Sequence, residues 1–183
     1  LGMSEKLIED FINGRCWSDI SSGEASKFIN QSEEHIRKMV ELSVCDLKDV
    51  SWRVAWLLGQ SISKSSNPIQ KYHLKIIKGI SEKESGHQRE LLKLVIDKNL
   101  SEEEEGRLFE VCIEIWKDIH KKPGTRSYAF KFIHQVVLKY PEIKNELVGL
   151  FESEYLETLS PAIKNSIEVK LNKLNVYLDL KKQ

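Results

Sequence analysis

Apolar residues recur at three- and four-residue spacing along almost the whole chain, and no segment alternates apolar and polar residues as a half-buried strand does. One apolar stripe runs through Ile36, Met39 and Val40, and another runs from Leu108 to Trp116. This spacing matches the turn of an α-helix, so each stripe marks the buried face of one helix. The period therefore predicts an all-α fold.

Helix-start signals support the same prediction. Ser101 followed by Glu104 fits a capping box, in which two side chains satisfy backbone N–H groups at the start of a helix. Proline is favoured at the first helical position, because the N–H that it lacks would have no partner there. Each of the four prolines stands where an apolar-periodic segment is expected to begin: Pro68, Pro123, Pro141 and Pro161.

The helical segments and their short connections predict a series of antiparallel helix pairs. The expected pairs are 32–46 with 51–64, 67–80 with 86–98, 101–120 with 123–140, and 141–157 with 160–177. Before them, a helix over 4–13, a loose stretch and a short helix over 24–30 are expected to cap the first pair. No internal linker is visible, so residues 4–183 are interpreted as one domain, and residues 1–3 as a cloning remnant with the initiator Met.

A basic residue near the start of each second helix reveals a repeat. These residues are Arg53, Arg89, Arg126 and Lys164, and they are separated by 36, 37 and 38 positions. Near-constant spacing of helix pairs is typical of an α-solenoid, in which each pair buries its apolar face against its neighbours. The sequence thus predicts about four stacked helical pairs behind an N-terminal cap.

The segment 51–58 (Ser-Trp-Arg-Val-Ala-Trp-Leu-Leu) resembles the second helix of a HEAT-like repeat. The segments 88–93 (Gln-Arg-Glu-Leu-Leu-Lys) and 140–144 (Tyr-Pro-Glu-Ile-Lys) fit the same family. The stretch from about residue 20 to 177 is similar to a small bacterial HEAT/armadillo-like family with no established activity. The resemblance implies a right-handed α–α superhelix, and it implies no particular function.

Motifs for catalysis are absent from the sequence. It has no glycine-rich phosphate loop, no H-E-x-x-H zinc motif and no G-x-S-x-G nucleophile elbow, and its five histidines are scattered. The three cysteines, Cys16, Cys45 and Cys112, form no C-x-x-C pair and are interpreted as small buried apolar residues. We therefore expect no enzymatic activity, no metal and no cofactor.

Cysteine usage and hydropathy indicate the compartment. An odd number of widely spaced cysteines argues against a disulfide framework and for a reducing cytoplasm. The longest strictly apolar run, Val54 to Leu58, is far shorter than the roughly 20 residues of a membrane-spanning helix. The sequence predicts a cytoplasmic protein with no membrane partner.

Two tryptophans on one expected helix allow two interpretations. Trp52 and Trp56 are four positions apart and share a helical face, on which they could stack against a ligand. The favoured interpretation places them in the core, because this helix is apolar on nearly every side. Arg126 is also open to two interpretations: it shares a stripe with apolar residues, so an internal hydrogen bond is at least as good an explanation as ligand contact.

Charge is segregated between the two helices of the expected pairs. The second helices carry eleven Lys or Arg against three Asp or Glu, whereas the first helices carry an equal and opposite acidic excess, so the net charge is zero. Second helices usually line the concave side of an α-solenoid, which predicts a basic groove that attracts anionic partners. The candidate binding residues are Arg53, Lys64, Arg89, Lys93, Lys131, Lys139 and Lys170, with Trp52 and Trp56 as an apolar anchor.

Three hypotheses about the partner follow from this groove. The favoured one is a non-enzymatic scaffold that holds an acidic protein segment. The alternative is a nucleic-acid-binding protein related to HEAT-like DNA alkylation-repair glycosylases and without excision activity, because no Asp stands near Trp52 and Trp56 at the expected step. A homo-oligomer, in which the basic groove docks on the acidic face of another copy, is the third.

Overall fold

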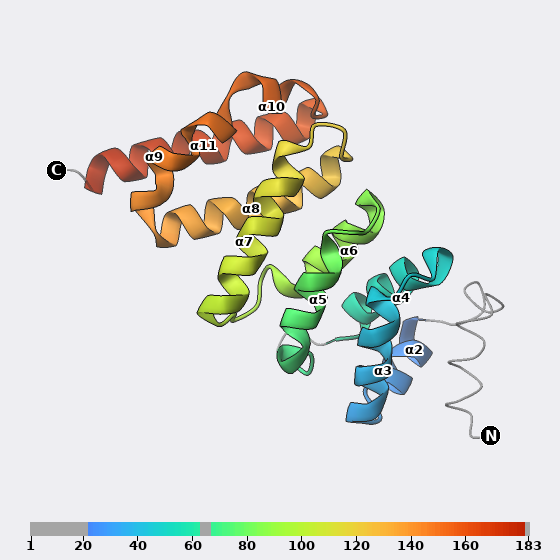
Figure 1. Ribbon diagram of the computed structural model, residues 1–183. Coiled ribbons are helices and arrows are strands. Elements are labelled where there is room, and N and C mark those ends of the chain that lie inside the picture. The colour runs from blue at the N-terminus through green and yellow to red at the C-terminus, as the bar shows by residue number, and fades with distance from the viewer. Residues whose placement is uncertain (1–21, 63–66, 182–183) are drawn as a thin grey trace. The chain divides into compact units, whose positions relative to one another are not determined.

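The computed structural model describes residues 22–62 and 67–181, and every regular element in these ranges is a helix (Figure 1). The all-α prediction is confirmed. The chain divides into two compact units, an N-terminal unit that ends at Glu104 and a C-terminal unit that begins at Glu105. The expected helix over 4–13, Lys64, Cys16 and Trp17 lie outside the described residues. One domain over 4–183 and a right-handed superhelix stay predictions.

The N-terminal unit consists of helix pairs packed side by side. Its elements are α2 (Ser22–Ile29), α3 (Glu33–Val44), α4 (Lys48–Ser61), a 3₁₀ turn (Gln70–Tyr72), α5 (His73–Ile80) and α6 (Ser85–Val95). As expected, α3 pairs with α4 and α5 pairs with α6. The pairs stack through like elements, since α3 packs against α5 and α4 against α6 (Figure 1). This is the arrangement of an α-solenoid.

The sequence explains where these helices begin and how closely they approach. The Ser32 hydroxyl caps α3 by accepting the backbone N–H of His35 at 3.2 Å. A Cβ atom at Gly79 of α5 would lie 2.9 Å from the side chain of Val44, so only glycine permits this close approach of α5 to α3. The core between the helices is apolar and fully buried at Met39, Leu58 and Ile76, among others.

The predicted helix over 67–80 begins later than expected. Pro68 is not at the first position of an α-helix, because the chain first makes tight turns in which Gln70 N–H donates to Asn67 and Tyr72 N–H donates to Ile69. These bonds span three residues, as in a 3₁₀-helix, and α5 starts only at His73. The proline still precedes the helix, so the error lies in the boundary.

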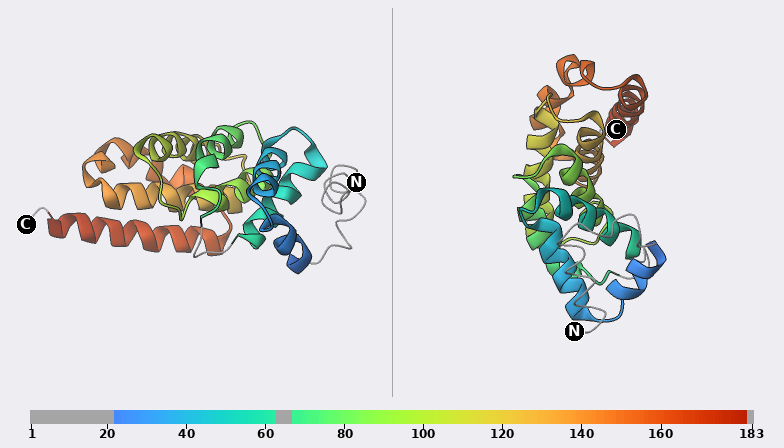
Figure 2. Two further views of the ribbon diagram at one scale, coloured as in Figure 1. Left: turned by 90° about the horizontal axis from the view of Figure 1, so that it is seen from below. Right: turned by 90° about the vertical axis from the view of Figure 1, so that its right-hand side faces the viewer.

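The C-terminal unit begins in α7, which runs from Glu102 to Lys117 across the boundary between the units. The remaining elements are α8 (Pro123–Lys139), a 3₁₀ turn (Pro141–Ile143), α9 (Lys144–Leu147), a 3₁₀ turn (Val148–Phe151), α10 (Ser153–Glu157) and α11 (Pro161–Lys181). Figure 2 shows α11 as one long helix, and it packs beside α8. The capping box is confirmed: Ser101 N–H donates to the Glu104 carboxylate at 2.8 Å, and Glu104 N–H to the Ser101 hydroxyl at 3.3 Å.

The predicted continuous helix over 141–157 is wrong, since this segment is broken into short α- and 3₁₀-helical pieces. The Trp116 indole Nε1–H donates to the carbonyl of Leu150 at 2.6 Å, and Arg126 Nη2 donates to the carbonyl of Tyr155 at 2.7 Å. A continuous helix needs its carbonyls for its own next turn. Side chains from α7 and α8 thus hold this segment in a shape that its local pattern does not specify.

Arg126 is fully buried, and its three polar nitrogens all donate within the unit. Nε bonds to the carbonyl of Trp116 at 3.0 Å, Nη1 to the Thr158 hydroxyl at 2.7 Å, and Nη2 to Tyr155. The guanidinium also lies 4.6 Å from the centre of the Trp116 ring. Burial lowers the pKa of this guanidinium from its ordinary value. The interpretation of Arg126 as an internal hydrogen-bond donor is confirmed.

Candidate functional site

The N-terminal unit contains most of the predicted binding residues. Trp52, Arg53 and Trp56 lie on α4, and Arg89 and Lys93 lie on α6, which packs against α4. The other candidates on described residues belong to the C-terminal unit: Lys131, Lys139 and Lys170. One continuous basic groove along both units stays a prediction, and the site is built here from the N-terminal unit alone.

Trp52 and Trp56 are exposed on α4. The two residues are 40% and 42% exposed to solvent, whereas Ala55 between them is fully buried. The favoured interpretation of Trp52 and Trp56 as core residues is therefore wrong. Trp116, which ends the predicted apolar stripe that starts at Leu108, is fully buried. An exposed pair of large aromatic side chains on one helical face is a feature of protein-interaction surfaces. Gly59 continues the same face, seven positions after Trp52.

Arg89 and Lys93 are anchored by a carboxylate that sequence analysis did not single out. Glu90 is only 3% exposed, and its carboxylate accepts from Arg89 Nε at 3.0 Å and from Lys93 Nζ at 2.9 Å. The two cations remain at the surface, with side-chain exposures of 45% and 33%. Glu90 thus reduces the net charge of the three-residue cluster to about +1 and holds the two cations at fixed positions on the surface. Charge-assisted bonds of this kind orient side chains well.

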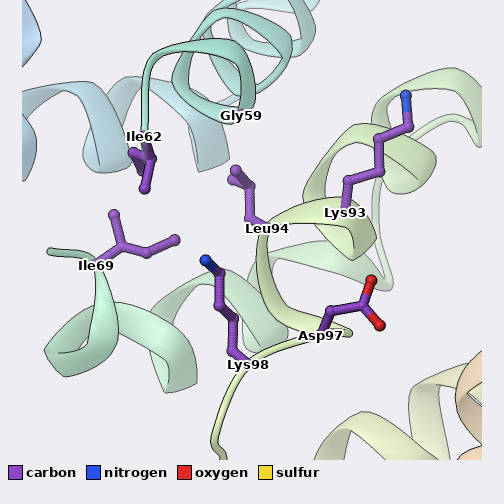
Figure 3. Close-up of a pocket in the computed structure, with 7 residues that line it drawn as sticks. All are labelled: Gly59, Ile62, Ile69, Lys93, Leu94, Asp97 and Lys98. Carbon is purple, nitrogen blue, oxygen red and sulfur yellow. The ribbon is translucent and has the colours of Figure 1, made fainter. Parts of the chain in front are cut away.

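A cavity lies between α4 and α6, and Gly59 of the tryptophan face and Lys93 of the basic stripe are among the residues that line it. It has a volume of about 290 Å³ and lies between the ends of α4 and α6 and the turn that precedes α5. Figure 3 shows the side chains of Ile62, Ile69, Leu94 and Lys98 around one space, and the side chains of Lys93 and Asp97 turned to the other side of α6. The full lining is Gly59, Ile62, Ile69, Lys93, Leu94, Asp97 and Lys98.

We call this region the α4–α6 surface and define it by Trp52, Trp56 and Gly59 on α4, Arg89 and Lys93 on α6, and the cavity between the helices. Arg53 lies at its edge, where the guanidinium is 5.4 Å from the centre of the Trp52 ring. Cations at such distances from an indole face are attracted by it. The surface therefore combines aromatic area, positive charge and a partly apolar hollow.

The predicted residues of the C-terminal unit have a different environment. Lys139 pairs with Glu105 of α7 at 2.9 Å and lies 4.9 Å from the ring of Tyr140. Hydrogen bonds to Tyr140 and Glu105 raise the pKa of Lys139 to about 12. Lys131 and Lys170 are half-buried on α8 and α11. Because Lys139 is tied to an acidic first helix, it contributes less to a basic surface than its position suggested.

Two histidines, His73 and His87, are buried in the core, and His134 is half-buried. Burial lowers the pKa of His73, His87 and His134 below the ordinary value of 6.5. His87 Nε2 lies 2.6 Å from the carbonyl oxygen of Ser43, so that nitrogen carries the hydrogen. Within residues 22–62 and 67–181, no three His, Cys, Asp or Glu side chains gather in a group that could hold a metal ion. Cys112 is buried as predicted, which raises the pKa of its thiol.

Sequence reasoning missed Lys98 and Glu90. Sequence analysis counted both only as charges of a second helix. The role of Lys98 depends on where α6 ends, and the role of Glu90 depends on how deeply its side chain is buried. Gly59 was the one available signal: a small residue seven positions after Trp52 leaves open space on the tryptophan face. The cavity itself is formed by three elements that are far apart in sequence.

Comparison with known proteins identifies the family. The family model of the HEAT repeat domain matches residues 18–174, which is most of the chain. No curated protein and no solved structure matches the chain significantly. No helix within the described ranges is long and apolar enough to span a membrane.

HEAT repeats form helical scaffolds, generally without enzymatic activity, and many of them mediate protein interactions. With its stacked helix pairs and this match, the chain belongs to the HEAT repeat domain family.

Proposed function

We propose that this protein is a non-enzymatic scaffold whose α4–α6 surface binds an acidic segment of another protein. The observation that carries the proposal is the exposed Trp52–Trp56 pair on α4 together with the basic stripe of α6, the helix that packs against α4 within one compact unit. Aromatic residues and Arg are the side chains most enriched among the residues that dominate binding energy at protein interfaces. Positive charge around them selects an acidic partner.

The charge of this surface supports an acidic partner. Arg53, Arg89, Lys93 and Lys98 outnumber the carboxylates of Glu90 and Asp97. Glu90 is buried, so a partner meets the cations first. The first helices of the same unit hold ion pairs of their own, such as Lys75 with Glu41 at 3.1 Å. A basic excess therefore remains on the second helices.

The test is binding of a fluorescein-labelled heptaglutamate peptide, followed by anisotropy at two salt concentrations. Reversal of the charge of Arg89 or Lys93 would remove one of the two partners of the buried Glu90 carboxylate and destabilise the fold. The triple variant Arg89→Gln/Glu90→Gln/Lys93→Gln removes the cluster as a whole. We expect it to bind the peptide about fivefold to tenfold more weakly than the unaltered protein at low salt.

Lys78→Gln on α5 is the matched control, because it changes the net charge by the same one unit on an exposed first-helix position outside the surface. It should leave affinity unchanged. Glu90→Gln alone removes one negative charge beneath the stripe, so we expect tighter peptide binding that weakens as salt screens the charges. Equal affinities of all four proteins would refute the proposal.

Nucleic acid is tested in the same assay. A labelled 20-nucleotide duplex replaces the peptide, and the slope of affinity against salt reports how many phosphates the protein neutralises. Duplex binding tighter than about 10⁻⁶ M at physiological salt, together with no peptide binding, would replace the proposed function with nucleic-acid binding. Sedimentation at the same two salt concentrations tests the predicted homo-oligomer.

A further inference from the structure

The cavity of the α4–α6 surface contains a lysine, Lys98, that the proposed function counts only as one positive charge of the surface. Lys98 follows the end of α6, and its ammonium points into the space between Ile62, Ile69 and Leu94 (Figure 3). Within the described part of the chain, no carboxylate lies within ion-pair distance of Lys98 Nζ. The charged groups nearest in sequence, Lys93 and Asp97, point to the other side of α6 (Figure 3).

The side chains of Ile62, Ile69 and Leu94 form the apolar wall of the cavity, and Lys93 and Asp97 also line it. Ile69 and Leu94 are almost fully buried and form its deep wall, whereas Ile62 is half-buried and Gly59 is exposed at its rim. A Cβ atom at Gly59 would lie 3.5 Å from Leu94 Cδ2, which is ordinary contact, so the glycine is not required by packing. Its lack of a side chain instead keeps the hollow open between α4 and α6.

We propose that this cavity is an anchor pocket for an aliphatic side chain of the acidic segment, with an adjacent carboxylate of that segment paired to Lys98. The inference rests on the proposed function, and it specifies the partner further: an acidic segment interrupted by a leucine-like residue. A cation beside an apolar wall favours a ligand that brings both hydrocarbon and negative charge. A hydrocarbon group alone would not pair with the ammonium, and a negative charge alone would not cover the apolar wall.

The volume supports an anchor of this size. About 290 Å³ accommodates one aliphatic side chain and is small for an extended peptide. The cavity opens beside Gly59, on the face of α4 that carries Trp52 and Trp56. A segment lying on the two tryptophans therefore reaches the pocket without leaving the surface.

The experiment uses three fluorescein-labelled heptapeptides with amidated ends. The first is Glu-Glu-Glu-Leu-Glu-Glu-Glu, the second has alanine in place of leucine, and the third has glutamine in place of the glutamate after leucine. We expect the full protein to bind the leucine peptide about tenfold more tightly than the alanine peptide, as burial of an aliphatic side chain implies. The glutamine peptide should bind about threefold more weakly than the leucine peptide.

Two variants locate these differences in the pocket. Gly59→Met extends a side chain over Leu94 and fills the hollow, so the preference for leucine over alanine should disappear. Gly59→Ala, the matched control, adds one methyl group in ordinary contact and should keep that preference. In Lys98→Gln the leucine and glutamine peptides should bind equally, since the charge that distinguishes them is gone. A purely structural Lys98 would change stability and leave this ratio intact.

The outcomes separate the two proposals. Salt-dependent binding of the alanine peptide that is lost in Arg89→Gln/Glu90→Gln/Lys93→Gln upholds the acidic-segment function. If leucine then gives no advantage, or if Gly59→Met keeps the advantage, the anchor pocket is refuted and the function stands. Failure of all three peptides to bind refutes both.

Discussion

Each unit of this protein contains a buried charged residue with several hydrogen-bond partners, and the two residues act in opposite ways. Glu90 is a buried anion that holds two cations at the surface, while Arg126 is a buried cation that binds neutral groups only: two carbonyls, a hydroxyl and an indole face. Glu90 shapes a candidate binding surface. Arg126 joins α8 to the segment before α11 and has no exposed atom to offer a ligand.

We expect Arg126→Met to destabilise the protein by about 2–4 kcal/mol, because it leaves a hydroxyl and two carbonyls without their charged donor. Arg126→Lys should recover little of this loss, since one ammonium cannot reproduce a fork that reaches three partners. Chemical denaturation monitored by tryptophan fluorescence and circular dichroism measures both. Lys117→Met, an exposed change on α7, is the control and should cost less than about 0.5 kcal/mol.

At the scale of the element, local signals specify some helix ends and leave others to tertiary contacts. The Ser101–Glu104 capping box is purely local and occurs as the sequence predicts. Glu104 has a second neighbour, because its carboxylate lies 3.8 Å from Nδ1 of the buried His73. A change at Ser101 therefore tests the cap alone, whereas a change at Glu104 would disturb two interactions.

Ser101→Ala should lower the free energy of unfolding by about 1 kcal/mol, since the N–H of Glu104 loses its hydroxyl acceptor. Ser81→Ala, at the exposed C-terminal end of α5, replaces the same residue type where it caps no helix start and should change stability little. Equal effects of the two substitutions in urea denaturation would contradict the assignment of the cap.

At the scale of the whole molecule, two buried histidines of the N-terminal unit and the half-buried His134 of the C-terminal unit link stability to pH. The folded-state pKa of His73, His87 and His134 is lowered, so below pH 6.5 the unfolded chain binds more protons than the folded protein. The stabilisation from the neutral histidines is therefore complete above pH 6.5, and the free energy of unfolding decreases as the pH falls toward their lowered folded-state pKa values.

We expect the free energy of unfolding to be at least about 1 kcal/mol smaller at pH 5.5 than at pH 7.0. His73→Leu removes one of these groups at a fully buried position and should flatten the dependence. His120→Gln, on an exposed histidine, should keep the slope of the unaltered protein. Urea denaturation across this pH range measures all three, and a His73→Leu slope equal to that of the unaltered protein would contradict the prediction.

The repeat of helix pairs could be predicted from the sequence because helical periodicity, caps and prolines are local signals. The apolar stripe through Ile36 and Met39 is buried as its spacing requires, and Pro123 and Pro161 begin α8 and α11. The basic stripe of Arg89 and Lys93 was also identified, since four-residue spacing places two side chains on one helical face. These features depend on residues less than two turns apart.

Only the tertiary structure decided the rest. Trp52 and Trp56 are exposed because no described element covers that face of α4, a fact that the apolar character of the helix concealed. The breaks between α9 and α11 depend on side chains of α7 and α8, and the Lys98 cavity depends on three elements distant in sequence. Local pattern fixes which face of a helix is apolar, but burial is a property of what packs against it.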